Sequence, residues 1–509
     1  MVSVRSLILP AIFALSSFSK TVNGQDEETN KFPALRDATI DDLAQGLKDR
    51  LFTSVDLVKA YIARIEEVNS ELRAVTEINP DALDIAAALD AEREDGEVRG
   101  QVKLSMGSLF NSPLHGLPIL IKNNIATADE MNNTAGSLAL KGAKVPRDSF
   151  IAKKLREAGA VILGKANMSQ WANYRSSNSS NGWSAHGGQV LGAYLQDQDS
   201  SGSSSGCGVA SDLGLAVACI GTETDGSIVS PSQRNNIVGF KPTIGLTSRD
   251  LVIPISEHQD TIGPMARTVK DAAYILQAIA GVDENDAYTS DIPDGLIPDY
   301  LAALDEDALA GARLGIPSNA LELFGMGNAD HPETHQFYVA FDVLRIAGAT
   351  VVGANFTGLS ADADFDVEGR VLDADLVVNL ASYLAQLTEN PADVHSLQDI
   401  RDFTRSTPGE EYPDRNTATW DGALQLGYNN TDAEFEEDLE KLRGYGNDWL
   451  LGAIEDNELD AVILPTSAAS LFAAWAAAPL VSVPMGFWPD DAEVVRNARG
   501  LATQGPGLP

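Results

Sequence analysis

Three short segments of the sequence combine hydroxyl or amine side chains with glycines. Residues 199–208 read DSSGSSSGCG, residues 221–231 read GTETDGSIVSP, and residues 116–125 read GLPILIKNNI, with Lys122 directly behind four apolar residues. A serine hydroxyl becomes a strong nucleophile only when a base removes its proton. A lysine can act as that base once burial favours its neutral form. Because glycine-rich turns can also aim backbone N–H groups at an oxyanion, the segments predict acyl transfer by a serine that a lysine activates.

The Ser/Gly run at 199–208 has a second interpretation, because this composition is typical of a flexible connector between domains. Its surroundings favour a site instead. Residues 209–220 are apolar, fit either a strand or a helix, and lead without a break into the loop at 221–231. Two small-residue loops on either side of a buried element place hydroxyls and N–H groups at one end of a sheet, where α/β proteins commonly bind ligands.

The elements that must hold these loops alternate between two kinds of apolar pattern. Thr53 and Ser54 precede apolar residues at helical spacing over 57–68, which predicts a capped amphipathic helix. Short continuous apolar runs predict buried strands at 118–121, 160–163, 216–220 and 461–464, and helical stretches lie at 151–158 and 268–279. Such strands, separated by helices, indicate an α/β fold whose sheet is covered on both faces. No repeat or long linker divides residues 25–509, which we expect to form a single domain.

Composition excludes several classes of function. The chain has 509 residues, of which 44% are hydrophobic, so it can bury a large core. It carries 36 Lys and Arg against 73 Asp and Glu, a formal net charge of −37. This charge repels nucleic acids and anionic membrane surfaces, and we interpret it as a solubility feature. The sequence contains no phosphate-binding loop, dinucleotide fingerprint or metal-ligand cluster, and Cys207 and Cys219 are its only cysteines, so we predict no cofactor and no metal.

The first 24 residues are typical of a secretory signal peptide. Arg5 precedes an apolar run from Leu7 to Phe18, and small or short residues end the segment at Gly24. A buried N-terminal helix is the alternative, but the run is uncapped and too short to span a bilayer. We therefore predict a secreted protein, for which four acceptor motifs for N-glycosylation become relevant, at Asn132, Asn178, Asn355 and Asn429. A fifth match, at Asn167, lies in an apolar setting and is interpreted as fortuitous.

The order of the motifs resembles the amidase signature family. After GLPILIKNNI, SGSSSG and GTETDGSIVSP come VGFKPTIGL at 238–246 and DTIGPMARTVKD at 260–271. TAGS at 134–137 and GKANMSQWAN at 164–173 also match, and the resemblance runs from about residue 38 to the end of the chain. It implies a large mixed β-sheet core with α-helices on both faces, and an enzyme that hydrolyses carboxamides.

The resemblance also implies roles for individual residues. Ser227 falls on the nucleophile, Ser203 on a bridging serine that follows a cis peptide bond from Gly202, and Lys122 on the final base. Ser204 is expected to support their hydrogen-bond network. The backbone N–H groups expected to form the oxyanion hole belong to Thr224, Asp225, Gly226 and Ser227.

Some positions depart from the commoner family wording. Glu223, Asp225 and Val229 replace Asp, Gly and Arg, and the resulting GTETDGSIV is similar to the branch that includes peptide amidases. This wording favours a small or peptide-like amide as substrate. Asn123 replaces the more usual Asp after the lysine, which alters the charge beside the base.

The end of the sequence is a further departure. Family members usually continue past a segment like GPGLP with another strand and a closing helix, but this sequence stops at Pro509. We therefore expect either a truncated domain, whose core lacks an edge strand and a covering helix, or a fold that closes differently. In the first case apolar surface and unpaired backbone groups would be exposed.

Three rival functions remain open. Residues 202–206 fit G-x-S-x-G, so Ser204 could be the nucleophile of a serine hydrolase. That enzyme would need a base among His258, His331, His335 and His395 and a strong strand before the loop, whereas 194–201 is polar. A secreted binding protein without turnover is the second rival, and a subunit of a tRNA amidotransferase is the third. The export signal and the acidity argue against the third. Trp171 and Trp183, near the active loops, are candidates for the wall of a substrate pocket, but a core role is favoured, and the oligomeric state is not predicted.

Overall fold

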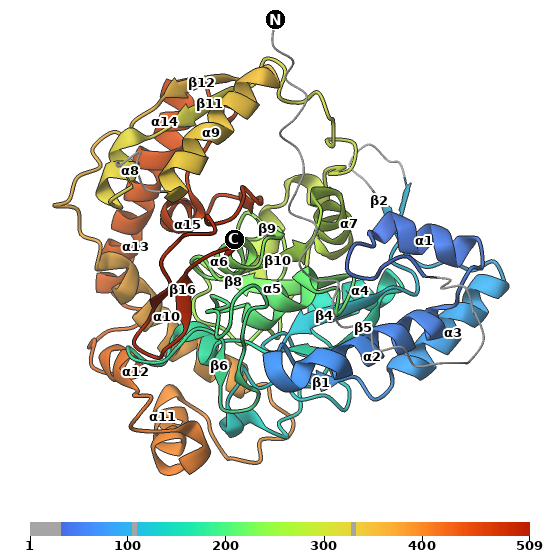
Figure 1. The fold of residues 1–509 in the computed structure, drawn as a ribbon. Helices are drawn as coiled ribbons and strands as arrows, with labels where there is room; N and C mark the ends of the chain where they lie inside the picture. The colour runs from blue at the N-terminus through green and yellow to red at the C-terminus, as the bar shows by residue number, and fades with distance from the viewer. Residues whose placement is uncertain (1–31, 104–108, 327–331) are drawn as a thin grey trace, which may run out of the picture.

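The computed structural model describes residues 32–103, 109–326 and 332–509. The predicted signal peptide at 1–24 therefore lies outside the described residues, as does His331. A seven-stranded mixed sheet forms the centre of the molecule, in the order β1-β5-β4-β8-β10-β9-β14 (Figure 1). Its strands are β1 (Val75–Ile78), β5 (Val161–Ala166), β4 (Pro118–Lys122), β8 (Ala218–Glu223), β10 (Thr261–Ala266), β9 (Val238–Lys241) and β14 (Leu480–Ser482).

The middle of this sheet explains the continuous apolar runs in the sequence. Strand β4 pairs parallel with both β5 and β8, whereas the outer pairs are antiparallel. Every residue of β4, β5, β8 and β10 is buried. Because successive side chains point to opposite faces, burial of every residue means that both faces are covered. The predicted α/β fold with a large mixed sheet is confirmed.

Helices from the first half of the chain pack against this sheet. They are α1 (Ile40–Lys48), α2 (Ser54–Leu72), α3 (Ala82–Glu94), α4 (Phe150–Glu157), α5 (Ser205–Asp212), α6 (Val229–Arg234) and α7 (Val269–Ile279). The predicted cap of α2 is present as a capping box, since Thr53 Oγ1 accepts from the N–H of Asp56 at 3.1 Å and Asp56 Oδ2 accepts from the N–H of Thr53 at 3.0 Å. The apolar stretch at 209–220 divides between the end of α5 and the start of β8.

A second, smaller sheet lies beside the main one, at the upper left of Figure 1. It is parallel, with the order β12-β11-β13, and comprises β11 (Arg313–Ile316), β12 (Thr350–Gly353) and β13 (Ala461–Val462). The strand predicted at 461–464 is therefore real but short, and it does not belong to the main sheet. Later helices include α8 (Ser318–Leu323), α9 (Pro332–Ile346), α10 (Val367–Leu384), α11 (Leu397–Ser406), α12 (Ala418–Ala423), α13 (Ala433–Gly446), α14 (Gly452–Asp456) and α15 (Thr466–Trp475).

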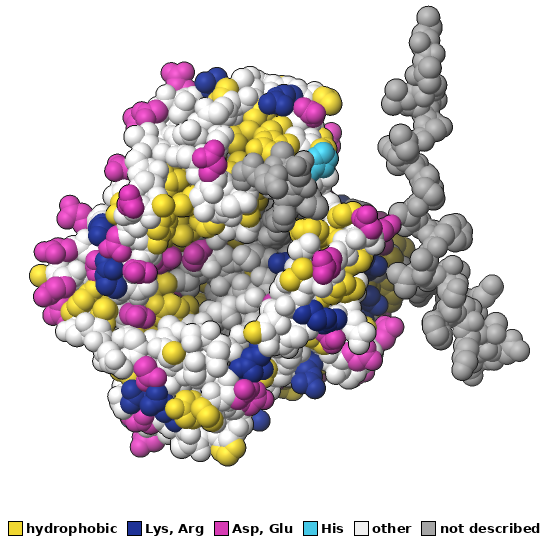
Figure 2. Space-filling view, turned by 60° about the vertical axis from the view of Figure 1, so that its left-hand side comes forward, with side chains coloured by type: hydrophobic (Ala, Val, Ile, Leu, Met, Phe, Trp, Pro, Cys, Tyr) yellow, Lys and Arg dark blue, Asp and Glu magenta, His cyan; other side chains and the backbone are white. Residues whose placement is uncertain are grey.

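Strand β14 forms one edge of the main sheet, and apolar side chains follow it at the surface. Val481, Val483, Met485 and Phe487 are exposed, Val483 to 60%. Elsewhere the surface is rich in Asp and Glu, and Figure 2 shows carboxylates distributed over much of the visible face. Within the described ranges, every helix is too short or too polar to span a membrane.

One covalent link joins α5, which contains the end of the Ser/Gly run, to β8. Cys207 on α5 and Cys219 on β8 form a disulfide, and both side chains are fully buried. The sequence alone did not indicate whether these cysteines pair. The disulfide ties α5, which begins within residues 199–208, to the strand that precedes 224–231.

Candidate active site

Lys122 is the last residue of β4, and its side chain is completely buried. Its Nζ lies 2.8 Å from Ser203 Oγ and 2.9 Å from Thr222 Oγ1, and it also donates to the Thr222 carbonyl at 3.1 Å. Burial lowers the pKa of Lys122 to about 7, while the negative charges of Asp260 and Glu223 act in the opposite direction. Near neutral pH, a neutral amine can therefore accept the Ser203 hydroxyl hydrogen across the same 2.8 Å.

The loop that carries Ser203 is held by backbone contacts on both sides. The Gly202–Ser203 peptide bond is cis, as the family resemblance implied. The N–H of Ser169 donates to the Ser203 carbonyl at 3.0 Å. Only glycine fits at 202, because a Cβ atom there would lie 2.3 Å from Ser169 Oγ. The Ser/Gly run is thus an ordered part of the site and not a flexible connector.

Ser204 connects the two serine loops. Its N–H donates to the Ser227 carbonyl at 3.1 Å, and its Oγ donates to the Thr222 carbonyl at 3.0 Å. The same Oγ accepts from the N–H of Thr222 at 3.3 Å. With its hydroxyl used twice in this way, Ser204 fits a supporting position better than that of a nucleophile.

Ser227 lies in the loop between β8 and α6 and is 7% exposed. This loop is fixed by carboxylates, since Glu223 Oε2 accepts from the N–H groups of Ile228 and Val229 at 2.6 and 2.9 Å. In the described part of the chain, the N–H groups of all four residues predicted for the oxyanion hole, Thr224, Asp225, Gly226 and Ser227, have no protein acceptor. They are therefore available to an oxyanion.

The contact between the two catalytic serine candidates is incomplete in this structure. Within the described residues, Ser227 Oγ makes no hydrogen bond to Ser203, although the backbone bond from Ser204 holds their loops together. Catalytic hydrogen bonds are often long without substrate and shorten in the reacting complex. The predicted residues Lys122 and Ser203 are in direct contact, and Ser227 lies on the adjoining loop.

The side chain of Asn123 acts as a hydrogen-bond acceptor for the segment at 134–136. Its Oδ1 accepts from the N–H and Oγ1 of Thr134 at 3.1 and 2.5 Å, and from the N–H of Gly136 at 3.3 Å. An acceptor is needed at this position, and an amide oxygen supplies one without adding a charge beside Lys122. The departure from the family wording therefore leaves the lysine contacts intact.

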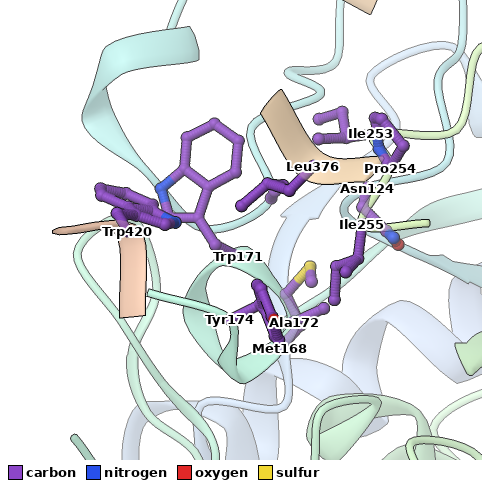
Figure 3. Close-up of a pocket in the computed structure, with 11 residues that line it drawn as sticks. Asn124, Met168, Trp171, Ala172, Tyr174, Ile253, Pro254, Ile255, Leu376 and Trp420 are labelled. Carbon is purple, nitrogen blue, oxygen red and sulfur yellow. The ribbon is translucent and has the colours of Figure 1, made fainter. Parts of the chain in front are cut away.

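A mainly apolar pocket with an empty volume of about 260 Å³ opens next to these loops (Figure 3). Its lining comes from distant parts of the chain: Asn124, Ala135, Met168, Trp171, Ala172, Tyr174, Ile253, Pro254, Ile255, Leu376 and Trp420. Trp171 and Trp420 meet edge to face, with ring centroids 5.7 Å apart and an interplanar angle of 77°. Both roles considered for Trp171, in the core and in the wall of a substrate pocket, are present: its side chain is buried, and it lines the pocket.

The turn that presents Trp171 has an unusual backbone. Trp171, Ala172 and Asn173 all have positive φ, at 52°, 53° and 70°. Such conformations cost free energy in residues other than glycine and persist only where the surroundings impose them. A buried ion pair supplies this support: Glu410 Oε2 accepts from Gln170 Nε2 at 2.5 Å and from Arg175 Nη1 at 3.1 Å.

The histidines that the rival hydrolase requires are elsewhere. His258 pairs with Asp375 at 2.8 Å, and His395 pairs with Asp393 at 2.8 Å. Among the described residues no histidine contacts Ser204. Glu257, His258 and Asp375 are close enough together to suggest a metal site. The Asp375 carboxylate accepts from Ser256 Oγ at 2.5 Å and from Asn430 Nδ2 at 2.9 Å, so hydrogen bonds within the protein account for the position of this cluster.

Comparison with known proteins finds relatives in sequence and in fold. The model of the family described as Amidase matches residues 56–493. A protein of Arthroderma benhamiae named "Putative amidase" is 50% identical over 509 residues, which cover 95% of this chain and 83% of that one. The crystal structure of native peptide amidase from Stenotrophomonas maltophilia is 38% identical, with a TM-score of 0.79, covering 89% of this chain and 91% of that chain. An amidase family protein from Bacillus anthracis is 31% identical, with a TM-score of 0.78, covering 92% and 86% of the two chains.

The fold and the comparisons together define a hydrolase that acts on the C–N bonds of amides. The chain belongs to the amidase signature family.

Proposed function

We propose that the protein hydrolyses a carboxamide to a carboxylate and ammonia or an amine through a serine acyl-enzyme. The observation that carries this proposal is the 2.8 Å contact between Ser203 Oγ and the amine of a fully buried lysine. A lysine whose pKa is about 7 is poised to exchange a proton at neutral pH. Ser227, on the adjoining loop, is assigned as the nucleophile.

In the proposed reaction, neutral Lys122 takes the hydroxyl proton of Ser203, and Ser203 takes the proton of Ser227. Ser227 Oγ then attacks the amide carbon, and the N–H groups of residues 224–227 stabilise the oxyanion. The relay returns the proton to the leaving nitrogen as the C–N bond breaks, which leaves an ester on Ser227. A water molecule, deprotonated by the same relay, hydrolyses the ester and regenerates the serine.

The pocket supports a substrate with one apolar or aromatic group on the acyl side. The pocket is lined mainly by apolar side chains, among them Trp171, Leu376 and Trp420. Its aromatic walls favour such a group because burial of apolar surface stabilises binding. The similarity to a peptide amidase supports a C-terminal peptide amide with an apolar last residue.

We also propose that the protein is exported, as the sequence of residues 1–24 suggests. A disulfide between Cys207 and Cys219 supports an oxidising compartment. The glycosylation motifs differ in access: Asn355 is exposed, whereas the amide nitrogens of Asn132 and Asn178 donate to Glu77 at 2.5 Å and to the Asp414 carbonyl at 3.0 Å. Asn355 is therefore the better acceptor candidate.

The test is ammonia release from a panel of peptide, aryl and alkyl amides by the wild-type protein and by Ser227→Ala, Ser203→Ala and Lys122→Ala. We expect each change to lower kcat by at least about a thousandfold, since the three groups act as one unit. Ser232→Ala removes another fully buried hydroxyl from the same segment, and Lys165→Ala removes another fully buried amine. These controls separate loss of chemistry from loss of packing.

Two results would redirect the assignment. Turnover that survives Lys122→Ala would favour a hydrolase with a different base. A folded wild-type protein that releases ammonia from no amide in the panel would favour the binding protein without turnover.

A further inference from the structure

Asn124 is the strongly polar side chain among the mainly apolar residues of the pocket. It follows β4 two residues after Lys122 and is 3% exposed. Its Nδ2 donates to Thr222 Oγ1 at 3.1 Å, but within the described residues its Oδ1 has no hydrogen-bond partner. A buried acceptor without a partner is unfavourable and needs an explanation. A donor supplied by a ligand is one.

Asn124 lies at the end of the pocket that is nearer to Lys122. Figure 3 shows Trp420 at one side of the pocket and Asn124 at the other. Thr222 Oγ1, which accepts from Asn124, also accepts from Lys122 Nζ at 2.9 Å. Asn124 therefore lies where an aromatic pocket meets the catalytic amine.

We infer that Asn124 Oδ1 accepts a hydrogen bond from an N–H carried by the carbon atom next to the scissile carbonyl. This inference rests on the proposed function and narrows its substrate class. In a peptide amide, the same α-carbon carries the side chain, the carboxamide and a backbone N–H. With the side chain in the pocket and the carboxamide at Ser227, the N–H is left to meet Asn124. Simple aryl and alkyl amides have no such donor, so the site selects α-acylamino carboxamides.

Three substrates that differ only around this donor test the inference. N-acetylphenylalaninamide carries the N–H, its Nα-methyl analogue lacks the hydrogen, and 3-phenylpropionamide lacks the whole group. For the wild-type protein, we expect kcat/KM to fall at least about fivefold from the first to each of the others, the effect of one hydrogen bond. Equal kcat/KM for all three substrates would overturn the inference.

A double-mutant cycle then separates contact with substrate from an effect through Lys122. Asn124→Ala also loses the bond to Thr222 and is expected to slow all three substrates. If Asn124 contacts the N–H, the fivefold preference shrinks to less than about twofold in this variant. If the preference persists, Asn124 acts only through Thr222, and the inference is wrong. Asn133→Ala, at another buried asparagine that bonds the backbone of Thr127, is the matched control and should keep the preference.

Binding measurements distinguish failure of this inference from failure of the proposed function. In a Ser227→Ala background, calorimetry gives Kd for N-acetylphenylalaninamide and its Nα-methyl analogue with and without Asn124→Ala. The cycle in Kd decides the role of Asn124 even if no amide is turned over. Should Asn124→Ala not fold, Asn124→Asp retains acceptor oxygens, and it should keep the discrimination against Nα-methylation. Loss of that discrimination in a folded Asn124→Asp protein would contradict the inference.

Discussion

At the scale of single residues, three lysines with different surroundings are buried in the described part of the chain. Burial lowers the pKa of Lys122 and Lys165 to about 7 and that of Lys241 to about 8. Lys165 donates to the Ile125 carbonyl and to Asn133 Oδ1, and Lys241 donates to the Ala478 carbonyl. Only Lys122 of the three contacts a serine. Burial makes an amine neutral, but a neighbouring hydroxyl makes it useful as a base.

Asn123 provides the test of this electrostatic argument. Asn123→Asp keeps the oxygen that accepts from Thr134 and adds a negative charge to the residue that follows Lys122. An opposite charge favours the ammonium form, so the pKa of Lys122 should rise. Because the base must be neutral, activity should be lost as pH falls through about 7 in the wild type and at a higher pH in the variant.

The measurement is kcat/KM against pH for both proteins on one amide. Asn133→Asp, which adds a charge near Lys165, is the control and should leave the acid limb in place. If kcat/KM fell at the same acidic pH in Asn123→Asp as in the wild type, the result would contradict the assignment of Lys122 as the base.

At the scale of elements, the wall of the pocket depends on an ion pair that touches no substrate. Arg175 and Glu410 are 3% and 0% exposed, and they hold the turn at Gln170–Asn173 that presents Trp171. The Arg175 guanidinium also donates to the carbonyls of Glu410 and Arg415, at 2.7 and 2.8 Å. Packing from a segment far along the chain thus sets the shape of a turn next to the active loops.

Removal of Arg175 should therefore affect both stability and substrate binding. Arg175→Met leaves a buried carboxylate unpaired, and breaking a buried pair usually costs about 3–5 kcal/mol. We expect KM for an aromatic peptide amide to rise about tenfold or more, with a smaller change in kcat, because Trp171 loses its position while Lys122 does not. Urea denaturation and steady-state kinetics measure the two effects.

The comparison variant is Arg405→Met, which breaks a partly exposed pair with Asp421. Exposed pairs are usually worth about 1 kcal/mol or less, so this variant should resemble the wild type in KM. A normal KM in a folded Arg175→Met protein would show that Trp171 does not need the ion pair.

Local sequence signals predicted the elements that hold the catalytic loops but not the pocket. Strands β4, β5 and β8 and helices α2, α4 and α7 follow from apolar periodicity and caps, which depend on neighbouring residues. The pocket joins Trp171 to Leu376 and Trp420, and no local pattern relates residues so far apart. The sequence also could not predict that β13 belongs to a separate sheet, because an apolar run does not specify its partner strand. The catalytic candidates came from the order of the motifs along the chain.

At the scale of the whole molecule, the buried lysines should make stability depend on pH. Their pKa values lie far below the ordinary value of 10.5. Above pH 8 the unfolded chain therefore binds protons that the folded chain does not, and stability rises with pH in that range. Burial raises the pKa of Tyr61 and Tyr383, so stability should fall again above about pH 10, where unfolded tyrosines ionise.

We expect the free energy of unfolding, and with it the urea midpoint, to increase from pH 7.5 to pH 9.5. The free energy should rise by up to about 1.4 kcal/mol per pH unit for each lysine. Lys165→Met removes one of the three groups and should reduce this slope whatever its effect on absolute stability. Lys270→Met, at a lysine that is largely exposed, should leave the slope unchanged. A midpoint that is flat or falls across this range would contradict the lowered pKa values.

The division of the site along the chain has a consequence for how such an enzyme could diversify. Lys122, Ser203 and Ser227 lie within residues 116–231, whereas Leu376 and Trp420 reach the pocket from α10 and α12. Substitutions in those two helices could change which side chain fits while the reacting groups stay in place. A gene duplicate could then acquire a new substrate range without passing through an inactive ancestor, and a mutant library confined to residues 367–423 would explore that range.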